Sequence, residues 1–267
     1  MTARARSLPA IVTFFALSFA WTWILWAISS LIQMRASDIS PILFLLSGFG
    51  PSLAALAVVS AFGNSGDLRG WLRQCLRWRV GWRWYAIALL APPIIMVAAL
   101  GTHALLGGAI PPSSLSGYGL IAVAQFGLVI LVGGPLGEEF GWRGYALPAL
   151  AERLGWRHAS LIIGAVWAFW HVPLFYIAGT AQADLPMAWF LASTVALSVI
   201  FARLSVNTDF SVIPAILLHS AINWWSMALP IMPKAGNERV YELAVMIMIA
   251  VALALLLLPG PKKIPEC

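Results

Sequence analysis

Long apolar stretches separated by short polar connections make up most of this chain. Each stretch is about 20 residues long, the length that an α-helix needs to cross the hydrocarbon core of a bilayer. The pattern predicts eight spans, over residues 9–33, 41–62, 83–106, 117–137, 158–178, 186–203, 211–229 and 240–258. Because the connections are short and show no repeat, we expect one integral-membrane domain over residues 1–267.

Hydrophobic residues make up 61% of the sequence and charged residues only 10%, whereas soluble domains are about 25% charged. The expected fold class is therefore all-α, a polytopic membrane helical bundle of about eight transmembrane helices. The first apolar run exceeds the roughly 7–15 residues of a signal-peptide h-region, so we expect a retained helix. Gly50-Pro51 and Pro92-Pro93 are expected to kink or open their helices.

The basic residues divide unevenly between the two sides of the predicted topology. If the N-terminus is inside, only Arg35, Lys234 and Arg239 fall outside, and the other 13 of the 16 Lys and Arg residues fall inside. Lys and Arg favour the cytoplasmic side. We therefore predict that both termini are cytoplasmic in a bacterial plasma membrane. The stretch 133–150 is then expected at the cytoplasmic end of the fourth span.

Residues 69–83 carry a dense run of positive charge, with arginines between tryptophans and leucines. Such a segment is typical of an amphipathic helix in the headgroup layer, where Trp71, Leu72, Trp78 and Trp82 would anchor it. Nucleic-acid binding is the weaker interpretation, because positive-inside topology already explains the charge. The expected partner of this segment is the lipid bilayer, and no nucleic acid is expected.

Two adjacent carboxylates, Glu138 and Glu139, lie next to an apolar stretch, and Arg143 follows Glu139 by four residues. Charged side chains are costly inside a membrane, so they mark candidate functional sites. In a helix that begins near Pro135, Glu139 and Arg143 pair on one face, while Glu138 projects about 100° away. The pattern predicts that Arg143 neutralises Glu139 and that Glu138 faces a cavity.

Two later apolar spans each carry a histidine with a partner at helical spacing. Trp167 precedes His171 by four residues in the fifth span, and His219 precedes Asn223 by four in the seventh. This spacing places the members of each pair on one helix face. Hydrogen bonding between packed membrane helices also explains each pair taken alone.

Together, one glutamate, two histidines and one asparagine would supply a general base, an orienting group and oxyanion donors for water attack on an amide. Alternatively, Glu138, His171 and His219 could bind zinc or another divalent metal, with an open position for water. The sequence contains neither the HExxH motif of zincins nor the GxSxG motif of many serine hydrolases.

The motifs within about residues 130–230 resemble those of the CPBP family of intramembrane proteases, which takes its name from CAAX proteases and bacteriocin-processing enzymes. This family also includes abortive-infection proteins and is related to the type II CAAX prenyl endopeptidases. The family motif EExxxR begins at Glu138, and HxxxN begins at His219. The motif FxxxH ends at His171, with Trp167 in place of the phenylalanine. The three motifs occur in the expected order, so their combination is more specific than any one of them.

The resemblance implies a hydrolase, an intramembrane endopeptidase that cleaves a membrane protein or peptide in a cavity open to the cytoplasm. Glu138 and His171 would activate the attacking water, while His219 and Asn223 would stabilise the tetrahedral oxyanion. The supporting residues would be Glu139, Arg143 and Trp167. Family members are often described as metalloproteases, and CAAX-box protein processing is their best-known activity.

Two interpretations from other classes remain. A proton-coupled transporter would use Glu138 and the histidines as a proton relay. An inverted repeat or paired broken helices would favour a transporter, and we find neither in the sequence. A catalytically silent immunity or scaffold protein would retain the same motifs, so an activity measurement is needed to distinguish it.

Overall fold

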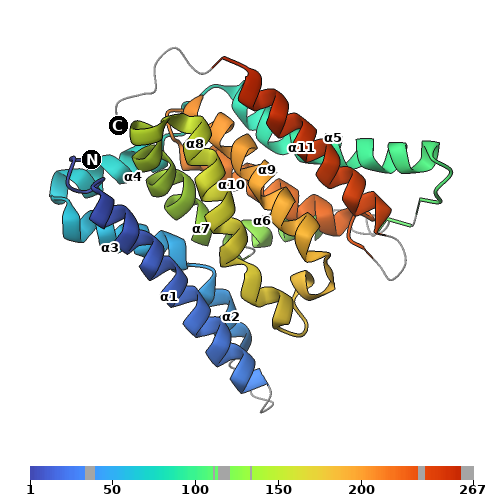
Figure 1. The fold of residues 1–267 in the computed structure, drawn as a ribbon, viewed down its shortest axis with the longest axis horizontal. Helices are drawn as coiled ribbons and strands as arrows, with labels where there is room; N and C mark the ends of the chain where they lie inside the picture. The colour runs from blue at the N-terminus through green and yellow to red at the C-terminus, as the bar shows by residue number, and fades with distance from the viewer. Residues whose placement is uncertain (34–39, 111, 114–120, 133, 234–237, 260–267) are drawn as a thin grey trace.

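A computed structural model of the chain describes residues 1–33, 40–110, 112–113, 121–132, 134–233 and 238–259. The elements are α1 (Leu8–Gln33), α2 (Ser40–Ser47), α3 (Gly50–Phe62), α4 (Ser65–Cys75), α5 (Trp82–Leu105), α6 (Ile121–Val132), α7 (Pro135–Gly141), the π-helix η1 (Trp142–Ala146), α8 (Leu147–Trp170), the 3₁₀ helices η2 (Val172–Tyr176) and η3 (Ala181–Asp184), α9 (Met187–Val206), α10 (Val212–Ala228) and α11 (Arg239–Leu257). The described residues contain no strand, so the predicted all-α fold is confirmed. Figure 1 shows α1 to α3 on one flank and α5 and α11 on the other.

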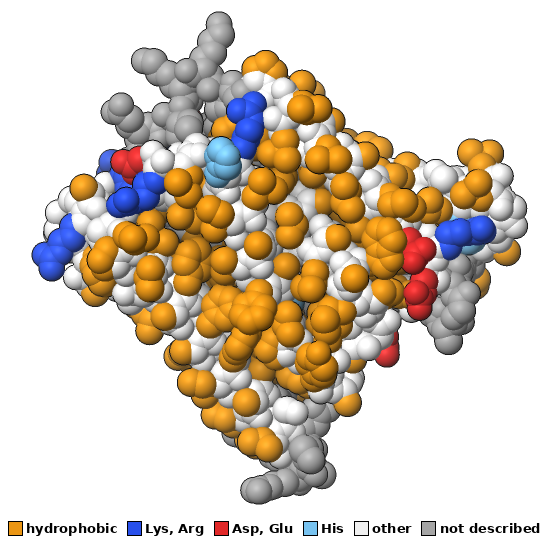
Figure 2. Space-filling view, in the orientation of Figure 1, with side chains coloured by type: hydrophobic (Ala, Val, Ile, Leu, Met, Phe, Trp, Pro, Cys, Tyr) orange, Lys and Arg blue, Asp and Glu red, His pale blue; other side chains and the backbone are white. Residues whose placement is uncertain are grey.

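Within the described residues, five helical segments are long and apolar enough to cross a membrane, or six if the bent pair α2 and α3 is one span. Two further apolar helices, α6 and α10, are shorter. All eight predicted spans therefore coincide with helices, although 117–120 and 133 lie outside the described residues. Large hydrophobic side chains are exposed along these helices and cover much of the face in Figure 2. This apolar surface indicates an integral membrane protein.

The break between α2 and α3 helps to position the site. The two helices meet at 48° next to Gly50-Pro51, so the predicted kink is present there, whereas α5 stays helical through Pro92 and Pro93. The helix α7 packs closely against this break, because a Cβ atom at Gly137 would lie only 2.4 Å from the carbonyl oxygen of Gly48. Glycine at position 137 thus permits the contact that fixes the start of α7.

The helix α8 bends back on itself at Gly155. The backbone there has φ 75° and ψ 155°, a conformation that glycine adopts far more readily than other residues. The part after Gly155 runs back beside η1 and α7, since the rings of Trp142 and Trp170 are 6.1 Å apart. This hairpin carries the fifth predicted span past the two glutamates.

The start of α1 and the end of α11 lie together at the Gly155 turn. Arg153 donates to the carbonyl oxygen of Arg6 over 3.0 Å, and Arg157 donates to that of Leu256 over 2.7 Å. Both ends of the described bundle therefore lie on one side, as the predicted topology requires. That this side faces the cytoplasm stays a prediction.

We call this side the basic end of the bundle. Its arginines are Arg4, Arg6, Arg69, Arg73, Arg77, Arg79, Arg83, Arg153, Arg157 and Arg203. Contacts hold these segments together: Arg77 pairs with Asp209 at 2.5 Å, and Arg203 donates to the carbonyl oxygen of Pro259 over 2.8 Å. Arg35, Lys234, Lys262 and Lys263, which entered the predicted charge count, lie outside the described residues.

The expected membrane anchors of residues 69–83 divide into two groups. Trp78 and Trp82 are 62% and 81% exposed, as lipid-facing anchors must be. The expectation for Trp71 is wrong, because its side chain is buried and its Nε1 donates to the carbonyl oxygen of Gly144 over 3.1 Å. Trp71 therefore attaches α4 to η1.

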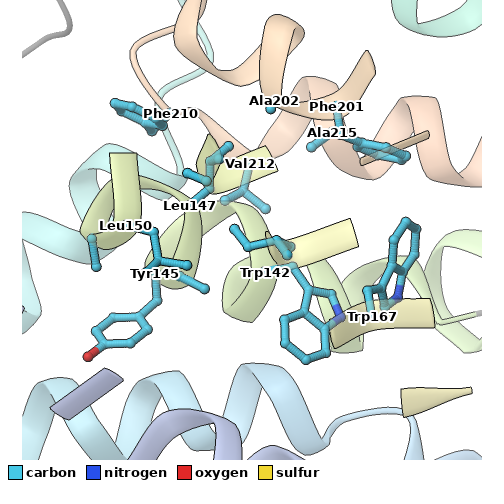
Figure 3. Packing of buried hydrophobic residues seen from close by; sticks show 14 of the residues in the cluster. Trp142, Tyr145, Leu147, Leu150, Trp167, Phe201, Ala202, Phe210, Val212 and Ala215 are labelled. Atoms are coloured by element: carbon cyan, nitrogen blue, oxygen red, sulfur yellow. The ribbon is translucent and has the colours of Figure 1, made fainter. Parts of the chain in front are cut away.

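The π-helix η1 lies in the main apolar core. Figure 3 shows Trp142 and Tyr145 projecting from this turn toward the N-terminal helices. The ring of Phe14 on α1 lies 5.5 Å from that of Trp142 and 5.0 Å from that of Tyr145. The packing of Trp142 and Tyr145 against α1 holds η1 in place. Arg143 projects from the opposite side of the same turn.

Candidate active site

Glu139 is the centre of a buried ionic cluster. Its Oε1 accepts hydrogen bonds from Nη1 of Arg143 over 2.9 Å and from Nδ1 of His219 over 2.7 Å. All three side chains are buried. Because a carboxylate only accepts hydrogen bonds, His219 is the donor at Nδ1, and its Nε2 remains for another partner. The predicted Glu139–Arg143 pair is therefore present, and His219 joins it from α10.

Glu138 projects from the same helix in a different direction. Its Oε2 accepts a hydrogen bond from Nε1 of Trp167 over 2.7 Å, and its side chain lines a cavity. The residue is only 5% exposed. The expected division between the two glutamates is thus present: Glu139 bonds to Arg143 and His219, whereas Glu138 faces the cavity.

Arg143 lies between two aromatic rings. Its guanidinium carbon is 4.2 Å from the ring centroid of Trp167 and 4.0 Å from that of Phe201. Desolvated cation–π contacts contribute about 2 kcal/mol, so these rings help to keep a buried charge in place. The sequence did not single out Phe201, because one phenylalanine in an apolar span carries no distinguishing signal.

His171 directly follows the last residue of α8. Its Nδ1 lies 2.8 Å from the carbonyl oxygen of Trp167, which can only accept, so Nδ1 carries a hydrogen. The α-helix ends here and continues as the 3₁₀ turn η2, which has Pro173 near its start. The imidazole packs against the ring of Phe190 at 5.2 Å. These contacts fix the orientation of the imidazole ring. The ring nitrogen that does not take part in the bond to Trp167 is Nε2.

A cavity of about 460 Å³ brings the four candidate catalytic residues together. Its lining includes Glu138, His171, His219 and Asn223. Asn223 is half-buried and lies one turn after His219 on α10, as the spacing predicts. Most of the remaining wall is apolar, from α1, α2, α5, α6, α9 and α11. Such a cavity can hold an apolar segment while four polar groups face one region of it.

The depth of the site can be described relative to the basic end, whereas the side of the membrane to which the cavity opens stays a prediction. Glu138 lies 17 residues before the Gly155 turn but only seven before Tyr145, whose hydroxyl donates to the carbonyl oxygen of Ala5 at the basic end over 2.9 Å. The arginines of the basic end are not among the residues that line the cavity. Its walls instead reach Gln182 and Leu185 near η3 and Tyr241 at the start of α11.

The side chains do not fit the metal-ligand alternative. Among the described residues, no group of three His, Cys, Asp or Glu side chains is arranged so that it could hold a metal ion. Glu138, His171 and His219 share a cavity without forming such a set, and Oε2 of Glu138 is bonded to Trp167. No step below therefore uses a metal.

Comparison with known proteins supports the resemblance seen in the motifs. Residues 119–225 match the family model described as type II CAAX prenyl endopeptidase Rce1-like. The chain is also 24% identical over 221 residues to a Methanococcus maripaludis protein named CAAX prenyl protease 2, covering 79% of this chain and 81% of the relative. The resemblance to this family of proteases is thereby confirmed, and the matched region contains all seven site residues.

Proposed function

We propose that this chain, a relative of the type II CAAX prenyl endopeptidases, hydrolyses a peptide bond of a membrane-associated protein or peptide. The observation that carries the proposal is the buried Glu138 carboxylate, which faces an apolar cavity. His171, His219 and Asn223 line the same cavity. A buried acid that shares a cavity with two histidines and an asparagine supports a functional role more than a structural one.

In the proposed reaction, Glu138 and His171 bind the attacking water. Glu138 uses the carboxylate oxygen that does not bond to Trp167, and His171 uses Nε2. Glu138 takes a proton as the water oxygen adds to the carbonyl carbon of the substrate. The proton then passes to the leaving nitrogen, the C–N bond breaks, and the carboxylate is regenerated.

The tetrahedral oxyanion is held by Nε2–H of His219 and by the side-chain amide of Asn223. This role requires hydrogens on both nitrogens of His219, one of which is bonded to Glu139. In that form, with both glutamates ionised, the cluster of Glu138, Glu139, Arg143 and His219 carries no net charge. A neutral cluster costs less to bury than one with an unpaired charge.

The name of the archaeal relative refers to CAAX prenyl processing, and we extend to this chain the broader activity of cleavage near the lipid boundary. The apolar cavity wall supports an apolar or lipid-modified peptide as substrate. A membrane protein or peptide, together with the bilayer, is the proposed partner.

The test compares the membrane peptidomes of cells that express the wild type and Glu138→Gln, which keeps the shape of the side chain but cannot take a proton from water. We expect a set of cleavage products to disappear in the variant. Glu238→Gln is the matched control, because Glu238 is an exposed acid at the start of α11. Unchanged processing by Glu138→Gln at normal expression would argue against the proposed base.

A further inference from the structure

The C-terminal half of α4 is attached to the turn that carries Arg143. Gly144 follows Arg143 in η1. Its carbonyl oxygen accepts hydrogen bonds from Nε1 of Trp71 over 3.1 Å and from Nε2 of Gln74 over 3.4 Å. The two elements are also closely packed, because a Cβ atom at Gly144 would lie only 2.8 Å from Sγ of Cys75. Hydrogen bonds and packing from α4 therefore hold η1 in place.

The same segment contacts the turn between α9 and α10. Nε2 of Gln74 donates to the carbonyl oxygen of Phe210 over 3.5 Å. Oγ of Ser211 donates to the carbonyl oxygen of Arg77, just after α4, over 2.6 Å. Phe210 has a φ of 57°, a left-handed conformation that is uncommon for residues other than glycine and that persists where surrounding contacts hold it. The helix α10, which carries His219, begins directly after this turn. Movement of α4 would thus disturb two elements that meet in the buried ionic cluster.

The side of α4 that faces away from the core is exposed and basic. Arg69 and Arg73 are exposed and four residues apart, so they share one stripe of the helix. The exposed Arg79 and Arg83 follow in the connection to α5 and in its first turn. We call these four arginines the basic face. None of them forms an ion pair with another residue that the structure describes, so their positive charge is available to an anion at the surface.

Apolar side chains lie next to the basic face. Leu72 and Leu76 occupy the neighbouring stripe of α4 and are 37% and 53% exposed, while Trp78 and Trp82 are 62% and 81% exposed. A helix with adjacent apolar and basic stripes lies in the membrane interface, with its apolar side chains among the acyl chains and its basic ones among the headgroups. Clusters of arginine at this depth attract anionic lipids.

We propose that the basic face binds the headgroups of anionic phospholipids, and that this contact keeps α4 docked on η1 and on the turn before α10. Trp71 and Gln74 are then positioning residues, through which the bilayer surface acts on Arg143 and His219. The effect on turnover rests on the proposed function, but the docking of α4 can be measured without any proteolysis.

The reactivity of Cys75 measures this docking, because its side chain is buried against Gly144 and a reagent reaches it only when α4 opens locally. The protein with Cys267→Ser is placed in nanodiscs of phosphatidylcholine, with or without phosphatidylglycerol. We expect phosphatidylglycerol to slow the reaction of Cys75 with a maleimide by about fivefold or more, since a single basic residue near an anionic surface already contributes that factor. Equal rates in the two lipids would overturn the proposal.

Two double variants test whether the basic face is responsible. Arg69→Gln/Arg73→Gln should remove the difference between the two lipids. The matched control is Arg4→Gln/Arg153→Gln, which removes the same charge from exposed arginines of the basic end outside α4. We expect the control to keep the difference. The same loss in both double variants would show that total charge, rather than this face, attracts the lipid, and would contradict the proposed site.

Turnover tests whether the docking of α4 acts on the site. We expect phosphatidylglycerol to raise kcat of the wild type by about fivefold, as it does for docking, with little change in KM. Trp71→Phe keeps a ring to pack against Phe140, 6.0 Å away in the wild type, but cannot donate to Gly144. This variant should respond much less, and so should Gln74→Leu, which loses its bonds to both turns. A full response in both variants would overturn the coupling. Absence of any turnover, with the expected reactivity of Cys75, would instead count against the proposed function and leave the lipid contact supported.

Discussion

The indole Nε1 of Trp167 donates a hydrogen bond of 2.7 Å to Oε2 of Glu138. A phenylalanine, the usual residue of the resembled family at this position, could not make this bond. The same indole ring lies 4.2 Å from the guanidinium carbon of Arg143. Trp167 therefore orients the proposed base and also covers the cation that pairs with the neighbouring glutamate.

We expect Trp167→Phe to lower kcat by about 10- to 10²-fold with little change in KM, because a hydrogen bond to a charged group contributes about 1.5–3 kcal/mol. The phenyl ring still covers Arg143, so the melting temperature should stay close to that of the wild type. Trp167→Leu removes both contacts and should lower kcat and stability together. If Trp167→Phe behaved as Trp167→Leu does, packing rather than the hydrogen bond would explain the residue.

Glu139→Ala should destabilise the protein more than any exposed ion-pair variant. It leaves Arg143 and His219 without the carboxylate that both contact, and breaking a buried pair costs about 3–5 kcal/mol. Thermal unfolding in detergent measures the loss. Arg77→Ala is the matched control, since Arg77 and its partner Asp209 are 43% and 51% exposed and such pairs contribute about 0–1 kcal/mol.

The double variant Glu139→Ala/Arg143→Ala refines this prediction. If the two residues act as a pair, the double variant should lose less stability than the two single variants added together. Strict additivity would show that the two residues contribute independently.

The parts of the site that sequence predicts are those set by local geometry. Glu139 and Arg143 are four residues apart, and so are His219 and Asn223, so helical periodicity alone places each pair on one face. Apolar length likewise predicts the spans, because a bilayer imposes its thickness on every crossing helix.

Contacts between distant segments could not be predicted in this way. His219 bonds to Glu139 across 80 residues, and Phe201 covers Arg143 from another helix. Trp71 looks like a lipid anchor in a basic segment, but its indole N–H bonds to the carbonyl oxygen of Gly144. The direction of the cavity also depends on how the helices pack, which no single periodic pattern encodes.

Asp67 connects the start of the chain to α4 at the basic end. Burial raises the pKa of Asp67, but hydrogen bonds from the backbone of Asn64 and from the hydroxyl and backbone of Thr2 outweigh it, so the pKa lies below its ordinary value. A carboxyl whose pKa is lower in the folded state stabilises the protein above its unfolded pKa. That contribution to stability is lost as the pH falls through the pKa of the carboxyl in the folded state.

We therefore expect Asp67→Asn to be less stable than the wild type at neutral pH, with the difference shrinking as the pH falls below about 4, the ordinary pKa of aspartate. Thermal unfolding of both proteins from pH 7 to pH 3 measures it. Subtracting one stability curve from the other cancels the contributions of the acids that both proteins contain. A difference that does not depend on pH would show that Asp67 acts through its shape rather than its charge.

Treatment with a chelator should leave most of the activity intact, because Glu138, His171 and His219 do not form a ligand set among the described residues. Metal analysis of active protein should find well below one equivalent per chain. Zinc at one equivalent, with activity lost to the chelator and restored by zinc, would contradict the water-activation mechanism.

Asn223→Ala should lower kcat by about 10²–10³, the usual effect of removing one oxyanion donor, while KM changes little. The reason is that the amide is proposed to bond to the charge that develops on the substrate oxygen, not to the uncharged carbonyl. Ser226→Ala is the matched control, because Ser226 is another half-buried polar residue of α10 in the lining of the same cavity. A rise in KM at constant kcat would instead make Asn223 a substrate-binding residue.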